Sequence, residues 1–165
     1  MALVVEDGTG ITNANAYVSV TEADSYFQAR NNTSWAARNT PDKEKAILYA
    51  TSFLDGVFYW LGHIKKNEQA LGWPRILVYD KEHRPIDSDS VPRKVKDATC
   101  ELALEALDKP LSPSLARGGD IKRQKVSSLE IEYFERASSE RTFPIVRQIL
   151  KGLYKDSPTA ELFRA

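Results

Sequence analysis

Hydrophobic side chains recur at helical spacing in four stretches of the chain, at about 22–30, 40–58, 90–107 and 144–154. The second stretch has a wide apolar stripe, typical of a helix buried on one side. This stripe combines two neighbouring rows, Ala46, Ala50, Phe53 and Val57 with Ile47, Leu54 and Phe58. Thr21, Thr40 and Ser90 stand where N-caps are expected for the first three helices.

The pattern changes to alternation after Gly118-Gly119. Residues 121–126 and 129–134 are predicted as two strands joined near Ser127-Ser128, and 76–79 as a further brief strand. Other parts of the chain show no sustained period. We therefore predict a mainly α fold, a small bundle of about four helices with a β-hairpin and extended N- and C-terminal arms.

This fold divides the chain into three parts. Residues 1–20 are predicted as an extended N-terminal arm, 21–154 as the helical domain and 155–165 as a C-terminal tail. Within the domain, 63–90 is a long loop and 120–134 the hairpin. Because long loops are uncommon in compact domains, this one is predicted to be functional.

Composition narrows the possible functions. The 165 residues carry 23 basic and 23 acidic side chains, so affinity for nucleic acid must come from a local patch. The single cysteine, Cys100, lies in an apolar helical pattern and is expected to be a buried, inert thiol. The two histidines, His63 and His83, lack the spacing of a metal site.

No phosphate-binding loop or nucleophile motif is present, so we expect neither an enzyme nor a cofactor. The N-terminal residues do not resemble a signal peptide, no stretch is long enough to span a bilayer, and no membrane partner is expected.

Two features indicate binding. The first is a basic cluster on the predicted hairpin, namely Arg117, Lys122, Arg123 and Lys125. Such cations can contact phosphates, or they can simply be the solvated edge of a strand. The second is a set of aromatic side chains, which can stack on bases, anchor a protein interface or fill the core. Trp73 in its irregular loop is the stronger interface candidate, whereas Trp60 is predicted in the core.

Several short motifs resemble a group of tailed-phage proteins encoded among capsid and tail genes. They are the segment from Asn13 to Phe27 (NANAYVSVTEADSYF), the segment Leu71-Gly72-Trp73-Pro74-Arg75, Val91-Pro92 before the long helix, and Gly118-Gly119-Asp120-Ile121-Lys122 leading to Glu132-Tyr133. Members are often described as DnaT-like single-stranded-DNA-binding proteins. The helical layout also resembles head–tail adaptors, which sit beneath the portal of a phage.

The adaptor resemblance implies a ring, typically of twelve copies, around a channel through which double-stranded genomic DNA passes without sequence preference. Its partners would be the portal protein, neighbouring copies and tail or head-completion proteins. It would be found at the head–tail junction of the virion, and in the host cytoplasm before assembly. The contacts predicted for portal or neighbours are Tyr17, Val18, Trp73, Arg75, Leu162 and Phe163. The basic cluster would face the channel or a neighbouring subunit.

The zero net charge favours the adaptor as the main prediction, since a strongly basic channel would retain the genome. The alternative is a single-stranded-DNA-binding accessory protein. In that role Lys122, Arg123 and Lys125 would contact phosphates, and Tyr133 or Trp73 would stack on bases.

Overall fold

The first three helices begin where short polar side chains accept hydrogen bonds from the first turn. In the computed structural model, α1 (Val20–Gln28) follows Ser19, which forms a capping box with Glu22. The helix α3 (Thr40–Val57) follows Asn39, whose side chain accepts from the Asp42 N–H. The caps predicted at Thr21 and Thr40 are therefore wrong by one or two residues, because the preceding side chain already satisfies the free N–H.

The structure describes residues 2–111, 123–126, 129–132 and 143–155, with the backbone alone for 123–126 and 129–132. Beyond α1 and α3, the helices are α2 (Thr33–Ala36), α4 (Arg93–Asp108) and α5 (Pro144–Leu150). The strands are β1 (Tyr59–Trp60), β2 (His63–Ile64), β3 (Arg75–Ile76), β4 (Arg123–Val126), β5 (Leu129–Glu132) and β6 (Tyr154–Lys155). The prediction of a mainly α fold is confirmed.

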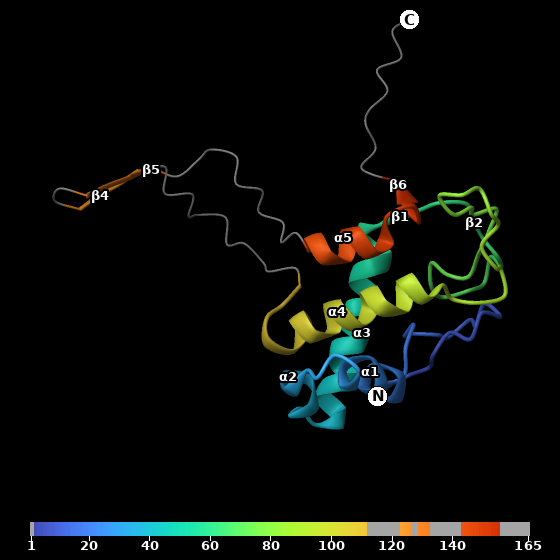
Figure 1. Cartoon of the computed structure of the whole chain (residues 1–165), viewed down its shortest axis with the longest axis horizontal. Helices are drawn as coiled ribbons and strands as arrows, with labels where there is room; N and C mark the ends of the chain where they lie inside the picture. Colours follow the sequence, from blue (N-terminus) through green and yellow to red (C-terminus); the bar gives the residue numbers. More distant parts are fainter. Residues whose placement is uncertain (1, 112–122, 127–128, 133–142, 156–165) are drawn as a thin grey trace, which may run out of the picture. The chain divides into compact units, whose positions relative to one another are not determined.

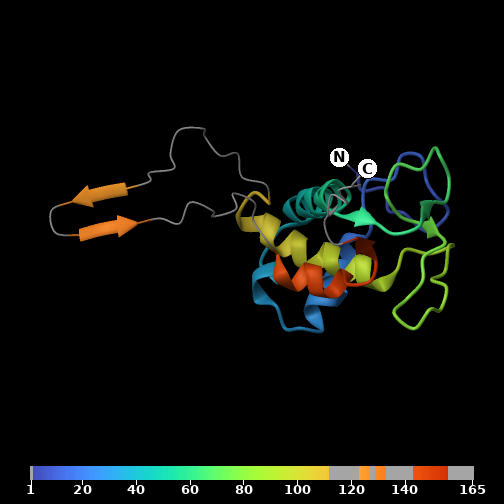
Figure 2. The same ribbon diagram turned by 90° about the horizontal axis from the view of Figure 1, so that it is seen from above.

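The helices pack around α4. Figures 1 and 2 show α5 lying alongside α4, with α3 running across it. Their facing sides supply much of the core, including Ile47, Leu54, Val95, Leu102 and Leu150, all fully buried. Much of the apolar stripe that predicted the second helix is thus buried, including Ile47, Ala50 and Leu54, whereas Val57 at its end is 41% exposed.

Pairs of very short strands complete this unit. β1 pairs with β6, and β2 pairs with β3, both antiparallel. The last helix ends at Leu150 rather than near Tyr154, because Gly152 takes a left-handed φ of 91° and Tyr154 pairs with Trp60 instead. The brief strand predicted at 76–79 is shifted to Arg75–Ile76.

The N-terminal segment packs on the helices instead of standing away from them. Ala16, Tyr17 and Val18 are buried in the core, and Val5 forms a parallel bridge with Ala16. The buried Glu6 carboxylate organises the preceding turn by accepting the N–H groups of Gly8, Gly10 and Ile11 at 2.8–2.9 Å. The segment predicted as an extended arm therefore belongs to the body of the protein.

The predicted hairpin is present as β4 and β5. It belongs to a second unit, residues 112–142, which is separate from the helical unit. The register places Arg123 opposite Glu132 and Lys125 opposite Glu130. Each described cation of the predicted basic cluster therefore stands across from a carboxylate at its cross-strand position.

Cys100 is buried in α4, as the sequence predicts. Burial raises the pKa of its thiol to about 12, and the nearby carboxylates of Asp97 and Glu101 add to this effect. A thiol with so high a pKa is almost entirely protonated at neutral pH and is a poor nucleophile. Among the described helices, none is long and apolar enough to cross a membrane.

Candidate nucleic-acid interface

Four of the residues predicted as interface contacts take structural roles, Val18 in the core and the other three around the loop that contains Trp73. Tyr17, Val18 and Trp73 are fully buried, so the prediction that they present an outward contact surface is wrong for this conformation. Trp73 packs edge-on against Trp60, with 5.9 Å between ring centroids. The local sequence looks like an exposed loop, but its partners come from distant parts of the chain.

Asp55 holds this region together. Its Oδ1 accepts the Tyr17 hydroxyl at 2.6 Å and the Trp60 indole N–H at 3.0 Å, while its Oδ2 accepts the Gly72 N–H at 2.9 Å. The Tyr17 oxygen in turn accepts the Trp73 N–H at 3.2 Å. Burial, with the neighbouring Asp55 charge, raises the pKa of Tyr17 well above its ordinary value, so its hydroxyl stays a donor.

Arg75 is also used inside the loop. Its guanidinium donates to the carbonyl oxygens of Leu61, Gly62 and Gly72, at 2.6, 2.8 and 3.0 Å. Burial lowers the pKa of Arg75 from its ordinary value. Because its guanidinium bonds to three carbonyl groups, the Arg75 side chain stabilises the loop and does not project toward an outside partner.

The other predicted contacts are described only in part. Arg117, Lys122, Leu162 and Phe163, and the stacking candidate Tyr133, lie outside the described residues. Arg123 and Lys125 lie on β4, where only the backbone is described. The roles proposed for these residues stay predictions.

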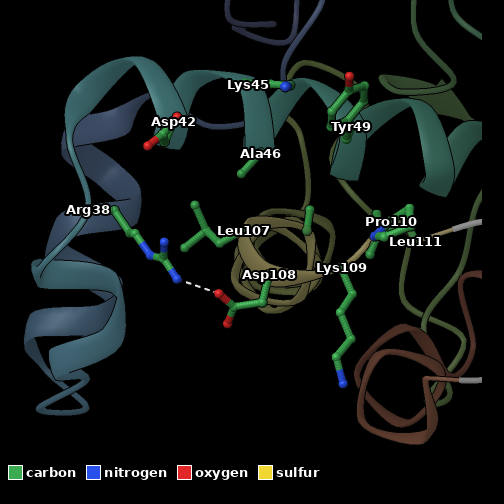
Figure 3. Close-up of a pocket in the computed structure, with 11 residues that line it drawn as sticks. Arg38, Asp42, Lys45, Ala46, Tyr49, Leu107, Asp108, Lys109, Pro110 and Leu111 are labelled. Atoms are coloured by element: carbon green, nitrogen blue, oxygen red, sulfur yellow. Dashed lines mark hydrogen bonds and ion pairs between the residues drawn. The ribbon is translucent and has the colours of Figure 1, made fainter.

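A different part of the molecule combines exposed cations with an exposed aromatic ring. It is a groove of about 340 Å³ between the outer face of α3 and the C-terminal end of α4, shown in Figure 3. We call it the α3–α4 groove. Its lining residues are Arg38, Asp42, Lys45, Ala46, Tyr49, Ala106, Leu107, Asp108, Lys109, Pro110 and Leu111.

Helical spacing on α3 brings Lys45 and Tyr49 together at the groove. The two are four residues apart and therefore share one face, opposite the buried Ile47 and Leu54. The Tyr49 ring is 54% exposed, and the Lys45 ammonium lies 5.7 Å from its centroid. This distance is near the outer limit of a cation–π contact, and the exposed fraction shows that much of the Tyr49 side chain is open to solvent.

The end of α4 supplies the opposite side. Arg38, which precedes α3, forms an ion pair with Asp108 across the groove, drawn as a dashed line in Figure 3. Lys109 is the residue after Asp108, and its side chain extends away from α3 in Figure 3. With Asp42, the lining holds three cations and two carboxylates, a formal excess of one positive charge.

An aromatic face beside lysine and arginine side chains suits a flexible anionic strand, because bases stack on the ring while cations meet phosphates. Sequence reasoning missed this site, although one signal was available. Lys45 and Tyr49 form an i, i+4 pair on the polar face of a predicted helix. Among the described residues, no group of three or more His, Cys, Asp or Glu side chains could hold a metal ion.

A family model described as "Putative DnaT-like ssDNA binding protein" matches residues 1–165. No curated protein and no solved structure matches the chain.

Proposed function

The chain belongs to the family of putative DnaT-like single-stranded-DNA-binding proteins, and from this premise we propose that it binds single-stranded DNA through the α3–α4 groove. The observation that carries the proposal is the family match, which spans all 165 residues. The groove supports it because it joins an accessible ring to cations. The protein acts in this role as an accessory binding protein without catalytic chemistry of its own.

The groove is preferred over the hairpin as the interface because its side chains are described, whereas only the backbone is described for Arg123 and Lys125. In the groove, none of the ion pairs among the described residues involves Lys45, and its ammonium lies beside Tyr49 instead. A phosphate can approach it without first displacing an acid.

The zero net charge makes binding dependent on local contacts. Charges beyond about 10 Å are largely screened at 0.1 M salt, so the cations of the groove act mainly at short range. Binding is therefore expected to weaken steeply with salt, by a slope of roughly 0.7 per phosphate neutralised on a single strand.

Replacing Tyr49 with alanine tests the proposal. We expect affinity for a labelled oligothymidylate, measured by fluorescence anisotropy, to fall about 5- to 150-fold, because stacking on one aromatic ring contributes roughly 1–3 kcal/mol per base. Lys45→Ala should weaken binding and reduce the salt slope by about 0.7. Tyr79→Ala is the matched control, since Tyr79 is also half exposed but lies outside the groove.

Two outcomes would count against this assignment. If the wild-type protein binds no oligothymidylate even at low salt, single-stranded-DNA binding is wrong. If it binds but Tyr49→Ala behaves like Tyr79→Ala, the interface lies elsewhere. The triple variant Lys122→Ala, Arg123→Ala and Lys125→Ala then tests the hairpin.

Removing the Asp108 carboxylate is expected to strengthen binding. Asp108 pairs with Arg38 in the groove and so occupies a guanidinium that a phosphate could contact. Both side chains are substantially exposed, so the pair itself is weak and easily displaced. We expect Asp108→Asn to raise affinity about 2- to 5-fold, for a gain of roughly 0.5–1 kcal/mol.

Asp97→Asn provides the control for this effect, because it removes the same charge from α4 at a position paired with Arg93 outside the groove. Adding Arg38→Ala to Asp108→Asn should cancel the gain. An equal increase in both asparagine variants would instead indicate a general effect of net charge.

The head–tail adaptor function stays a prediction, as do the portal partner, the twelve-membered ring and the location in the virion. The family description that matches the chain names single-stranded DNA and no adaptor. The match therefore supports the alternative reading of the sequence over the main one.

A further inference from the structure

A second cavity, of about 380 Å³, lies where α1, α2 and the start of α3 meet. We call it the α1–α3 cavity. Its lining includes Asp24 and Phe27 of α1, Trp35 of α2 and Lys43 of α3, and it shares no lining residue with the α3–α4 groove. A volume of this size is within the range of sites that hold small molecules, roughly 300–1,000 Å³.

Two aromatic rings give the α1–α3 cavity an apolar wall. Phe27 and Trp35 are both buried, with ring centroids 4.7 Å apart and planes tilted by 31°. Asp24 is three residues before Phe27 on α1, so the two side chains share one face of that helix. Helical spacing therefore brings a carboxylate to the edge of the aromatic wall.

Lys43 is a buried lysine at this cavity, with only 8% of the residue exposed. Its Nζ donates to Asp24 Oδ1 at 2.9 Å and lies 5.5 Å from the centroid of the Trp35 ring. The Trp35 indole N–H donates to the same oxygen at 2.7 Å. A lysine ammonium has three N–H groups, and the bond to Asp24 uses one of them. Lys43 can therefore also donate to a molecule in the cavity.

Asp24 supplies a matching acceptor. Its side chain is 46% exposed, so the carboxylate is within reach of a molecule that enters the cavity. Burial opposes ionisation, but the hydrogen bonds from Lys43 and Trp35 outweigh it and lower the pKa of Asp24 from its ordinary value. At neutral pH the group is therefore an ionised carboxylate, which only accepts hydrogen bonds. The cavity thus presents a donor beside an acceptor.

The charge of the α1–α3 cavity differs from that of the groove. Asp24 and Lys43 are the charged residues among its described lining residues, and their charges cancel. This balance suits an uncharged group better than a phosphate. A nucleobase is such a group, because it combines apolar faces with donors and acceptors side by side on its edge.

The α1–α3 cavity lies next to the α3–α4 groove along the chain. Asp42 lines the groove and Lys43 lines the cavity, and the Cα atoms of consecutive residues are about 3.8 Å apart. Ala36 and Arg38 border the two sites in the same way. A strand whose phosphates meet the groove cations can therefore place a neighbouring base in the cavity.

We propose that the α1–α3 cavity receives one nucleobase of the bound strand, with the amino group of the base donating to Asp24 and a neighbouring acceptor of the base accepting from Lys43. This inference rests on the proposed function, the binding of single-stranded DNA in the groove. The site favours cytosine over thymine, because cytosine carries an amino group that a carboxylate can accept and thymine carries none.

Two labelled homopolymers of equal length, oligodeoxycytidylate and oligothymidylate, test this preference by fluorescence anisotropy. Both bases are pyrimidines on the same backbone, so a difference reports the edge of the base. We expect the wild-type protein to bind oligodeoxycytidylate about 5-fold more tightly or better. Asp24→Asn should bring the ratio close to one, because the amide keeps one oxygen for Lys43 and Trp35 but replaces the other with an NH₂ group.

Asp97→Asn is the matched control, since it removes the same charge from α4 at a position outside both the cavity and the groove. It should leave the ratio of the two affinities unchanged. Far-ultraviolet circular dichroism of both variants checks that they are folded.

A titration of the wild-type protein covers the case in which Asp24→Asn disturbs the fold. Free deoxycytidine carries no phosphate and so does not depend on the groove cations. We expect it to shift the Trp35 indole N–H signal in nuclear magnetic resonance spectra, because that N–H bonds to the Asp24 carboxylate. The indole signals of Trp60 and Trp73, which lie outside the cavity, should not move. Thymidine should shift the Trp35 signal less.

The outcomes separate this inference from the proposed function. Equal wild-type affinity for the two homopolymers, or a preference that survives in a folded Asp24→Asn variant, would overturn the base site and leave single-stranded-DNA binding intact. A Trp35 indole signal that deoxycytidine does not shift would overturn the base site as well. A wild-type protein that binds neither homopolymer even at low salt would instead overturn the proposed function, and this inference with it.

Discussion

Replacing Trp73 with alanine is expected to lower the free energy of unfolding by about 3–5 kcal/mol, the usual cost of removing a large buried aromatic side chain. Trp73 is fully buried and packs edge-on against Trp60. Its backbone N–H also bonds to Tyr17. A cavity at this position removes contacts between the loop, β1 and the N-terminal segment together.

Urea denaturation measures this loss as a shift of the midpoint at constant m value. Tyr79→Ala, at a half-exposed position of the same loop, should cost much less. Trp73→Phe is expected to lower the free energy of unfolding by less than Trp73→Ala. Among the described residues the Trp73 indole N–H has no hydrogen-bond partner, so phenylalanine keeps apolar contact and removes an unpaired donor. A Trp73→Ala loss as small as that of Tyr79→Ala would contradict the buried position.

Replacing Asp55 with alanine is expected to lower the free energy of unfolding by about 2–4 kcal/mol, because hydrogen bonds to a charged group are strong and their loss leaves donors unsatisfied. Asp55 accepts from Tyr17, Trp60 and Gly72. An alanine supplies no acceptor for any of them.

Two variants separate the contributions in the same denaturation measurement. Asp55→Asn keeps one oxygen acceptor but presents an NH₂ group that cannot accept from a second donor, so its loss should be smaller than that of alanine. Asp42→Ala removes an exposed carboxylate from the same helix and should change stability by less than about 0.5 kcal/mol. Equal stability of the Asp42 and Asp55 variants would show that this network contributes little.

Both predictions concern residues of two motifs that carry the family resemblance, the N-terminal segment and the loop segment around Trp73. The N-terminal motif contributes Tyr17, and the loop motif contributes Gly72, Trp73 and Arg75. Both meet at Asp55 of α3, whose neighbourhood the sequence assigned simply to a core helix. In the structure these motifs hold the fold together, so the DNA binding proposed above is assigned to another surface, the α3–α4 groove.

The sequence by itself determined the elements whose pattern is local. The apolar stripes predicted the helices now seen as α1, α3, α4 and α5, and alternation predicted the hairpin of β4 and β5. The burial of Cys100 followed from its place in a helical stripe. In each case the signal repeats within a few residues, because helix and strand geometry fix which neighbouring side chains share a face.

Tertiary structure alone decided which side chains of the irregular segments are buried. Tyr17 and Trp73 are 56 residues apart, and each lies in a stretch without a period, so nothing local distinguishes a buried aromatic from an exposed one. The i, i+4 spacing of Lys45 and Tyr49 was visible in the sequence, but the end of α4 that completes their groove was not. The reason is physical: periodicity records which side of an element faces the core, whereas burial of a loop and the shape of a groove depend on which distant segments pack together.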